Sequence, residues 1–292
     1  MPDSTDTIVG FVGLGRMGLP MCRRLLAGGY SLVVYNRTPG KADPLVAAGA
    51  RRAASLADLA ASCAVIITCL DTVAASSDVF LGNDGLIANA RKDAVLIEHS
   101  TITARLTAEI AAAARARGVG FLDAPVSGGP EGAAAGTLTI MAGGNVEAFD
   151  HAAPVMHTYG QLVHRMGDSG AGTNTKLVNQ LLTFVNGSVA AEAIALGQRL
   201  GLDLDALATV LRASFGQSRM LERTLDRVKA GNYEAGAALS LFNKDLAIIA
   251  EAGADSAMAL WVAVFARELE ALAERRGLGD KDIAALRLLY DA

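Results

Sequence analysis

A lysine and two amides share one short segment, GTNTKLVNQ, in the second half of the chain. Lys176 is followed by Asn179 and Gln180 at i+3 and i+4, so a helix would project all three from one face. A lysine near the positive end of a helix is electrostatically disfavoured, and its presence there needs a reason. Beside a cofactor in a partly dry cleft, the pKa of a lysine falls towards neutrality and the amine becomes a proton carrier. The segment alone fits an ordinary surface lysine equally well.

A small-residue turn, Ser127-Gly128-Gly129, follows the segment FLDAPV. Successive backbone N–H groups in such a turn form a concavity that binds anions, and glycine lets a carboxylate come close. Without a ligand the same residues would make a plain loop, and the turn by itself favours that interpretation.

Glycines at the spacing G-x-G-x-x-G follow the apolar run Ile8 to Val12. A pyrophosphate needs backbone N–H groups at a helix N-terminus, and this arrangement provides them. The alternative is a tight turn between a strand and a helix with no ligand. The position of the turn, after the first strand and before a helix, favours a dinucleotide. The residues expected to bind it are Gly13, Leu14, Gly15, Arg16, Met17 and Gly18.

The second apolar strand ends on Asn36-Arg37-Thr38, about 20 residues beyond the glycines, where an acidic residue would bind the ribose of NAD. The chain has no Asp or Glu there. Arg37 with the Thr38 hydroxyl suits a 2′-phosphate, because a guanidinium makes paired charge-assisted bonds to it. The alternative is a solvated arginine in a polar turn. The sequence therefore predicts NADP in preference to NAD.

Strand-like apolar runs alternate with helical segments through the first half of the chain. The expected strands are residues 8–12, 31–35, 64–70, 94–99, 137–142 and 161–166, and the expected helices start near 16 and cover 44–48, 56–61, 103–117 and 146–157. This alternation predicts a doubly wound, Rossmann-type α/β domain with a parallel sheet. Ligands collect beyond the carboxyl ends of such strands, so Leu70-Asp71, Ser100-Thr101 and 123–129 should converge on the nicotinamide.

Only helices are expected after residue 170. A long interdomain helix, about 170–200, should be followed by helices at 203–214, 221–230, 239–253, 258–276 and 280–290. We therefore expect an NADP-binding domain over 1–165 and an all-α substrate and oligomerisation domain over 166–292. In the helix at 258–276, an apolar stripe predicts a core position or a subunit interface; its residues are Met258, Trp261, Phe265, Leu269 and Leu272.

The composition describes a globular chain of 292 residues, with 52% hydrophobic and 19% charged residues. Its net charge of −4 gives no reason to expect a nucleic-acid partner or an anionic membrane. Its start is polar and lacks the features of a secretory signal, and its longest apolar run is too short to span a bilayer. Three cysteines without a C-x-x-C indicate reduced core thiols in the cytoplasm, and four scattered histidines predict no metal site.

The chain resembles the β-hydroxyacid dehydrogenase family over nearly its whole length. This family includes 3-hydroxyisobutyrate dehydrogenases and 2-hydroxy-3-oxopropionate (tartronate semialdehyde) reductases and is related to 6-phosphogluconate dehydrogenases. The resemblance rests on GFVGLGRMGLPM at 10–21, VYNRT at 34–38, FLDAPVSGG at 121–129, GAGTNTKLVNQ at 170–180 and FNKDL at 242–246. Spaced motifs in the right order are far more specific than the glycine pattern alone.

The resemblance implies a role for each matched position. Lys176 would be the catalytic acid/base, and the substrate carboxylate would bind at Ser127, Gly128 and Gly129. Asn179 and Gln180 would contact substrate. Around the cofactor, the resemblance and the strand ends place Asn36, Arg37, Thr38, Leu70, Asp71, Thr101 and Lys244. The expected reaction is hydride transfer between NADP(H) and a small hydroxy acid or semialdehyde, in a homodimer or homotetramer.

One departure from the family pattern bears on the substrate. The family commonly has two asparagines after the lysine, whereas this chain has Asn179 and Gln180. The added methylene moves the second amide by about 1.5 Å, enough to change its hydrogen bonds.

Two related enzyme classes and one non-catalytic class are alternatives to this function. A 6-phosphogluconate dehydrogenase would have histidine at Asn179, and an imine reductase would usually have Asp or Tyr at Lys176, so both fit less well. A non-catalytic NADP-binding interaction module is the alternative from a different class, and the presence of Lys176 counts against it.

Overall fold

The computed structural model describes residues 7–235 and 238–291. Its contacts divide the chain into two compact units, Met1–Lys176 and Leu177–Ala292. The first unit combines a sheet with helices and the second contains helices, which confirms the predicted fold class. The division falls inside the long helix, and the expected domain boundary at residue 165 stays a prediction.

Within the described residues, nine strands form one sheet in the order β3-β2-β1-β4-β5-β6-β8-β7, and β9 pairs with β8. The strands are β1 (Ile8–Val12), β2 (Ser31–Tyr35), β3 (Arg51–Arg52), β4 (Val65–Thr68), β5 (Val95–Glu98), β6 (Gly120–Asp123), β7 (Val126–Ser127), β8 (Leu138–Gly143) and β9 (Gly160–Gly167). The pairs from β3 to β6 are parallel, as predicted. By contrast, β8 runs antiparallel to β6 and to β7, because the connection through β7 does not cross back over the sheet.

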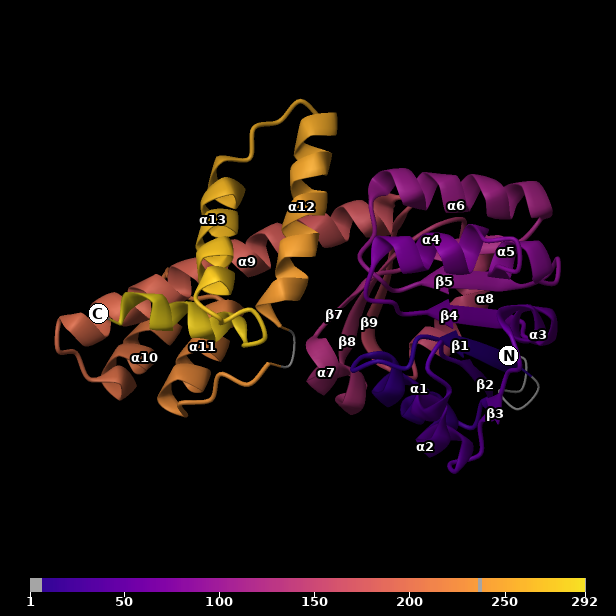
Figure 1. Cartoon of the computed structure of the whole chain (residues 1–292), viewed down its shortest axis with the longest axis horizontal. Coiled ribbons are helices and arrows are strands. Elements are labelled where there is room, and N and C mark those ends of the chain that lie inside the picture. Colours follow the sequence, from indigo (N-terminus) through magenta and orange to yellow (C-terminus); the bar gives the residue numbers. More distant parts are fainter. Residues whose placement is uncertain (1–6, 236–237, 292) are drawn as a thin grey trace. The chain divides into compact units, whose positions relative to one another are not determined.

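Neighbouring residues of each central strand point into two different cores. In β4, Val65 and Ile67 join one hydrophobic cluster and Ile66 joins the other. The first core is covered by α1 (Gly18–Ala27), α2 (Asp43–Val46), α7 (Gly129–Ala135) and α8 (Val146–Met156). The second core is covered by α3 (Leu56–Ser62), α4 (Val73–Leu81), α5 (Leu86–Asn89) and α6 (Ala104–Arg117). Figure 1 shows α4 and α6 on the opposite side of the sheet from α1 and α2. Burial on both faces explains why the strands read as continuous apolar runs.

Three helices of the first unit were not expected from the sequence. The segments of α4 and α5 carry no sustained apolar stripe, although Thr72 caps α4 by accepting the Ala75 N–H at 3.1 Å. The third, α7, begins at Gly129, inside the segment expected to be a loop. Glycine has a low helix propensity, so the sequence did not indicate a helix there. The short 3₁₀ helix η1 (Pro39–Ala42) precedes α2.

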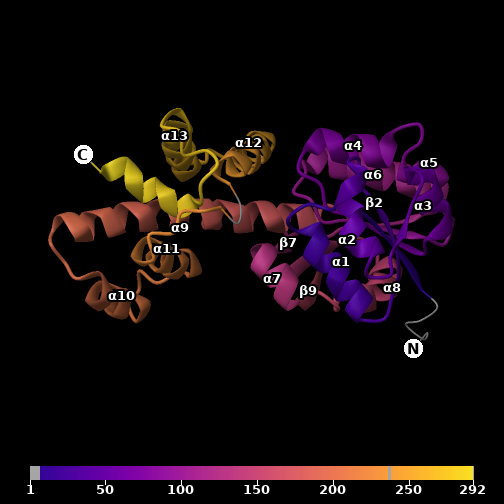
Figure 2. The same cartoon turned by 60° about the horizontal axis from the view of Figure 1, so that its bottom comes forward.

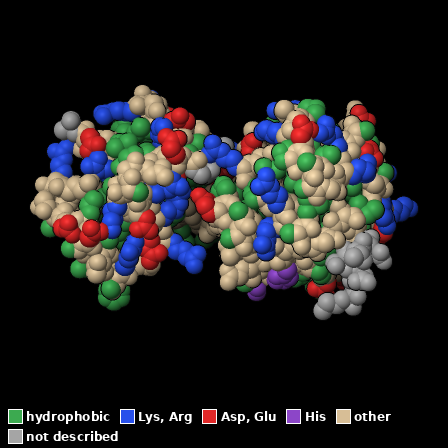
Figure 3. Space-filling view, turned by 90° about the horizontal axis from the view of Figure 1, so that it is seen from below, with side chains coloured by type: hydrophobic (Ala, Val, Ile, Leu, Met, Phe, Trp, Pro, Cys, Tyr) green, Lys and Arg blue, Asp and Glu red, His purple; other side chains and the backbone are tan. Residues whose placement is uncertain are grey.

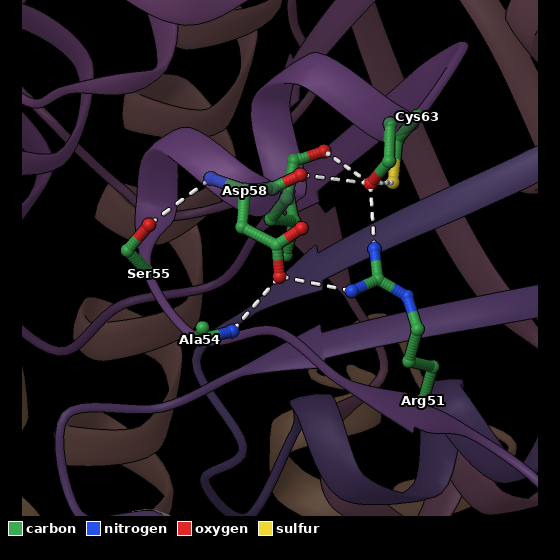
Figure 4. A network of polar contacts seen from close by, with 7 residues as sticks. Arg51, Ala54, Ser55, Asp58 and Cys63 are labelled. Carbon is green, nitrogen blue, oxygen red and sulfur yellow. Dashed lines mark hydrogen bonds and ion pairs between the residues drawn. The ribbon is translucent and has the colours of Figure 1, made fainter.

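An ion-pair network anchors α3 beside the outer strand β3. Asp58 accepts hydrogen bonds from the Ala54 backbone and from Arg51, each at 2.9 Å, and Arg51 also donates to Ser62 (Figure 4). Ser55 caps the helix by accepting the Asp58 N–H. The Ala54 hydrogen bond and then the Arg51 guanidinium hold the pKa of Asp58 below its ordinary value. The network fixes the sheet edge next to β2.

The second unit is built around the long helix α9 (Ala171–Arg199). The other elements are α10 (Leu204–Arg212), α11 (Arg219–Lys229), α12 (Leu239–Asp255), α13 (Trp261–Arg275) and the 3₁₀ helix η2 (Ile283–Tyr290), which replaces the predicted last helix. In Figure 2, α12 and α13 lie on one side of α9 and α10 and α11 on the other. The buried Asp282 accepts a two-pronged pair from Arg223 at 2.7 and 2.6 Å and so ties η2 to α11.

The apolar stripe on α13 does not form a core in this chain. Trp261 is 76% exposed and Phe265 is 77% exposed, and Met258 lies outside the helix. The core interpretation is therefore wrong for these three residues. Instead, the buried line along α13 consists of Ala263, Ala266, Glu270 and Ala273, whose alanines allow close packing of the helix. The subunit-interface alternative stays a prediction.

The surface carries charges of both signs, and the thiols lie buried or half-buried. Positive and negative side chains are interspersed on the face shown in Figure 3. Cys22 and Cys63 are buried, as predicted, whereas Cys69 is half-buried; all three are free thiols. Among the described residues, no helix is long and apolar enough to cross a membrane.

A buried histidine joins the end of β5 to the segment after β6. His99 Nδ1 donates to the Ala124 carbonyl at 2.5 Å, because a carbonyl only accepts, and Nε2 accepts from the Tyr159 hydroxyl at 2.9 Å. Burial lowers the pKa of His99 from 6.5 to about 4. Since the unfolded chain protonates first, this group removes stability as the pH falls from about 6.5 to about 4.

Substitution Tyr159→Phe tests this anchor. It leaves His99 Nε2 without its donor in a fully buried site, so we expect the free energy of unfolding in urea to fall by about 1–3 kcal/mol. Tyr30→Phe, at a partly buried tyrosine beside the same core, should change it by less than about 0.5 kcal/mol. Equal stability of Tyr159→Phe and the native protein would contradict a stabilising hydrogen bond from the Tyr159 hydroxyl to His99 Nε2.

Candidate active site

The glycine turn after β1 is shaped by close packing. Gly13 has φ of +98°, and a Cβ there would overlap the carbonyl oxygen of Cys69. A Cβ on Gly18, the first residue of α1, would overlap the carbonyl oxygen of Gly13. Gly15 differs, because nothing lies within 4 Å of the place its Cβ would take. The open space at Gly15 fits a ligand that approaches the backbone, as a dinucleotide pyrophosphate does.

Asn36 connects this turn to the loop that follows β2. Its Oδ1 accepts the Leu14 N–H at 2.9 Å, and its Nδ2 donates to the Thr38 carbonyl at 3.0 Å. Arg37 and Thr38 are exposed beside it. The structure therefore holds the residues expected at the pyrophosphate and those expected at the 2′-phosphate in one hydrogen-bonded arrangement.

The loops after β4 and β5 are also joined. Ser100 accepts the Leu70 N–H at 2.7 Å, and its own N–H donates to the buried Glu98 at 2.7 Å. Burial raises the pKa of Glu98, and the hydrogen bonds from Ser100 oppose this rise. Leu70 and Thr101 are half-buried and Asp71 is exposed. Because β1, β4, β5 and β6 are neighbours in parallel, the segments expected at the nicotinamide lie along one edge of the sheet.

Asp123, the last residue of β6, holds the start of α9. Its Oδ1 accepts the Gly170 N–H at 2.8 Å and its Oδ2 accepts the Thr173 N–H at 2.7 Å. Two accepting oxygens at a helix N-terminus indicate the ionised carboxylate. Burial raises the pKa of Asp123, and the hydrogen bonds from Gly170 and Thr173 act in the opposite direction. The sequence placed Asp123 in a segment beyond the carboxyl ends of the strands but did not reveal this capping role.

Packing tightens the same junction. A Cβ on Gly172 would overlap the carbonyl oxygens of Asp123 and Met141, so α9 starts directly against the sheet. The Thr107 and Thr173 hydroxyls are 3.0 Å apart and join α6 to α9. These contacts fix both the position and the rotation of the first turn of α9.

Lys176 follows one turn later and is only 7% exposed. Its Nζ donates to the Val126 carbonyl at 2.7 Å, so the amine lies next to the Ser127 turn. Gly128 and Gly129 have φ of +132° and +66°, and Gly129 begins α7. The structure thus brings the expected proton carrier and the expected carboxylate site together within the first unit. The roles of these residues stay predictions.

The remaining predicted residues form a network in the second unit. Gln180 Nε2 donates to Asp245 Oδ2 at 2.6 Å, and Asn179 Nδ2 donates to Gln180 Oε1 at 3.2 Å. Lys244, expected at the cofactor, has its Nζ 3.2 Å from Asp245 Oδ1. Its approach to the cofactor stays a prediction.

Sequence reasoning missed Asp245 and the buried Glu270. The motif FNKDL contains Asp245, but the family resemblance implies a role only for its neighbour Lys244. Burial raises the pKa of Glu270 to about 8, with smaller contributions from Glu274 and Asp245. The available signal was a carboxyl at helical spacing from Ala266 and Ala273, which are buried on α13 with it.

Comparisons with known proteins show which family this chain is similar to. Residues 8–167 match a family model described as the NAD binding domain of 6-phosphogluconate dehydrogenase. Residues 170–290 match one described as NAD-binding of NADP-dependent 3-hydroxyisobutyrate dehydrogenase. The chain is 37% identical over 290 residues to the NAD-dependent L-serine dehydrogenase of Pseudomonas aeruginosa, with 97% of each chain covered.

Two solved structures are similar over almost the whole chain. The 3-hydroxyisobutyrate dehydrogenase of Salmonella typhimurium is 34% identical with a TM-score of 0.87, covering 97% of this chain and 100% of that one. Psf3 in complex with NADP+ and 2-OPP is 28% identical with a TM-score of 0.89 and the same coverage.

Substitution Asp123→Asn tests the two hydrogen bonds that Asp123 accepts at the start of α9. The amide can accept only one of the two N–H groups and turns a donor towards the other, so the free energy of unfolding should fall by about 1–3 kcal/mol. Denaturation in urea measures this change. Asp168→Asn, at an exposed carboxylate near the start of the same helix, should stay within about 0.5 kcal/mol of the native protein. Equal free energies of unfolding for Asp123→Asn and Asp168→Asn would contradict a stabilising role of the Asp123 hydrogen bonds.

Proposed function

This chain belongs to the β-hydroxyacid dehydrogenase family, and we propose that it oxidises a small β-hydroxy acid to the semialdehyde, reversibly, with NADP as cofactor. It is an NAD(P)-dependent oxidoreductase. The observation that carries the proposal is the buried Lys176 Nζ, held 2.7 Å from the Val126 carbonyl and one residue from the Ser127 turn. The substrate class is of the 3-hydroxyisobutyrate or 2-hydroxy-3-oxopropionate type.

Three parts of the first unit have separate roles in this mechanism: the Ser127 turn, the Lys176 amine and the Val126 carbonyl. The backbone N–H groups of Ser127 to Gly129 bind the substrate carboxylate and so fix which carbon reacts. When bound, the nicotinamide dinucleotide supplies or accepts the hydride. During oxidation, Lys176 Nζ as the neutral amine takes the proton of the substrate hydroxyl. During reduction, the same atom as ammonium donates a proton to the developing alkoxide. The Val126 carbonyl orients the amine by accepting from it.

The chain's own residues fit a dinucleotide. The turn from Gly13 to Gly18, including Leu14, Gly15, Arg16 and Met17, would hold the pyrophosphate. Arg37 and Thr38 would bind the 2′-phosphate of NADP, and Asn36 holds their loop against the turn. Leu70, Asp71 and Thr101 would line the nicotinamide end. The similar protein Psf3 is described with NADP+, and the L-serine dehydrogenase is named NAD-dependent. The absence of an acid after β2 favours NADP here.

Substitution Lys176→Ala tests the assigned proton carrier. We expect kcat to fall by about 10²–10⁴-fold while the Kd for NADPH changes little, because the amine acts on the substrate oxygen. Steady-state rates with a panel of semialdehydes and fluorescence titration of NADPH measure the two effects. Lys92→Ala, at an exposed lysine of the first unit, is the control and should keep native rates. Turnover of Lys176→Ala close to native would refute the mechanism.

Substitution Arg37→Ser tests the cofactor preference. Loss of a charge-assisted contact of about 1.5–3 kcal/mol should lower kcat/KM for NADPH by about 10–100-fold and leave that for NADH nearly unchanged. Initial rates with both cofactors give the ratio. Arg23→Ser on α1, also an exposed arginine, should not alter the ratio. A native protein that prefers NADH would refute the role of Arg37.

A further inference from the structure

We propose that His99 is a positioning residue for this reaction: its ring N–H holds the Ala124 peptide and thereby places the Ser127 turn. The Val126 carbonyl, which accepts from Lys176, lies between the two and is placed with them. This inference rests on the proposed function and adds to it a buried residue that acts through its neighbours. All five residues belong to the first unit, so every contact involved lies within one compact body.

The segment between β6 and β7 carries groups that the proposed reaction needs. It runs from Ala124 through Pro125 to Val126, whose carbonyl accepts from Lys176 Nζ at 2.7 Å, and Ser127 follows directly. Because proline has no N–H, the segment has one donor fewer with which to bond to its surroundings. Its position therefore depends on the hydrogen bonds that Ala124 and the Pro125 carbonyl make.

Hydrogen bonds fix this segment from different sides. The Ala124 N–H donates to the Glu98 carbonyl at 2.8 Å, and the Pro125 carbonyl accepts the Met141 N–H at 3.1 Å. The carbonyl of the fully buried Ala124 accepts from His99 Nδ1 at 2.5 Å. The first two bonds are backbone pairings, which do not depend on side chains. The third requires a side-chain donor, so a substitution at position 99 can remove it selectively.

The ring of His99 is itself held in place. Its Nε2 accepts from the Tyr159 hydroxyl at 2.9 Å, and the two rings meet edge to face with their centroids 5.6 Å apart. Both side chains are buried, with His99 only 3% exposed. The Tyr159 carbonyl accepts the N–H of Leu138, the first residue of β8, and β8 pairs with β7. The ring is therefore tied to the same strands as the segment that it supports.

Only one neutral form of the ring makes both contacts. A carbonyl only accepts, so the proton must lie on Nδ1, and Nε2 is then free to accept from the Tyr159 hydroxyl. Because burial lowers the pKa of His99 to about 4, the ring is uncharged at neutral pH and carries a single N–H. That N–H is committed to Ala124.

Loss of this N–H should affect the substrate more than the cofactor. The buried Ala124 carbonyl would lose its donor, and a shift that relieves this would move the Val126 carbonyl and the Ser127 turn. The glycine turn after β1 and the loop after β2, which are expected to bind the dinucleotide, lie on other strands. Ser100, next to the ring, is held separately, because its N–H donates to the Glu98 carboxyl at 2.7 Å.

The test compares two amides at position 99. His99→Asn can place an N–H donor where Nδ1 lies but leaves the Tyr159 hydroxyl without its acceptor, whereas His99→Gln can reach Tyr159 but not donate to Ala124. His99→Gln should lower kcat/KM for the hydroxy acid by about 10–100-fold, and His99→Asn by less than about fivefold. The Kd for NADPH, from fluorescence titration, should stay within about threefold of native in both.

Thermal unfolding separates positioning from a purely structural role. His99→Asn should unfold at a lower temperature than the native protein, because a buried hydroxyl loses its acceptor, and yet keep its activity. His151→Leu, at an exposed histidine of α8, is the control and should keep native kinetics and stability. If His99→Gln does not fold, His99→Leu replaces it and is judged by the same outcomes.

The outcomes separate this inference from the proposed function. A native kcat/KM in His99→Gln, or equal losses in His99→Gln and His99→Asn, would overturn the positioning role. NMR spectra of the ring nitrogens at neutral pH give a readout besides activity: Nδ1 of His99 should carry the proton, and a proton on Nε2 would refute the contact with Ala124. Retained turnover in Lys176→Ala would refute the proposed function itself and would leave the NMR result unchanged.

Discussion

The carboxylate of Asp123 fixes the start of α9, and the start of α9 fixes the amine of Lys176. Both carboxylate oxygens are used, one by Gly170 and one by Thr173, so the helix can neither slide nor rotate without losing a buried hydrogen bond. Gly172 permits the close approach that this requires. A flexible four-carbon side chain gains a defined position in this way, because its Nζ then reaches the Val126 carbonyl.

The same junction resolves the electrostatic problem of a lysine near the positive end of a helix. The negative charge of Asp123 lies at that end of α9, where it offsets the helix dipole. The Val126 carbonyl adds an acceptor for the amine itself. Placement next to Ser127 then brings the proton carrier to the turn that is expected to bind the substrate carboxylate. One arrangement therefore serves stability and the proposed chemistry together.

Local patterns predicted much of the fold and part of the site, because the interactions behind them lie close together in sequence. The glycine turn, the strand from Ser31 to Tyr35 and the long helix are of this kind. The contacts of Asp123 with α9 and of Gln180 with Asp245 could not be predicted, since they join residues 47 or more positions apart and depend on how elements pack. The stripe on α13 misled for a related reason: the helix buries its alanines, and Trp261 and Phe265 remain exposed. The glycines at the start of α7 are typical of a turn, so the sequence did not predict the helix that begins there.

The central claim is that the Lys176 amine carries the proton of the reaction, and chemical rescue tests it most directly. Small primary amines of different basicity are added to the Lys176→Ala variant, and the rate of NADPH oxidation with a semialdehyde is followed. The account predicts a rate that rises with amine concentration and depends on the basicity of the amine, whereas the Lys92→Ala protein should not respond. A Lys176→Ala protein that keeps native turnover, or one whose low turnover no amine increases, would contradict the claim.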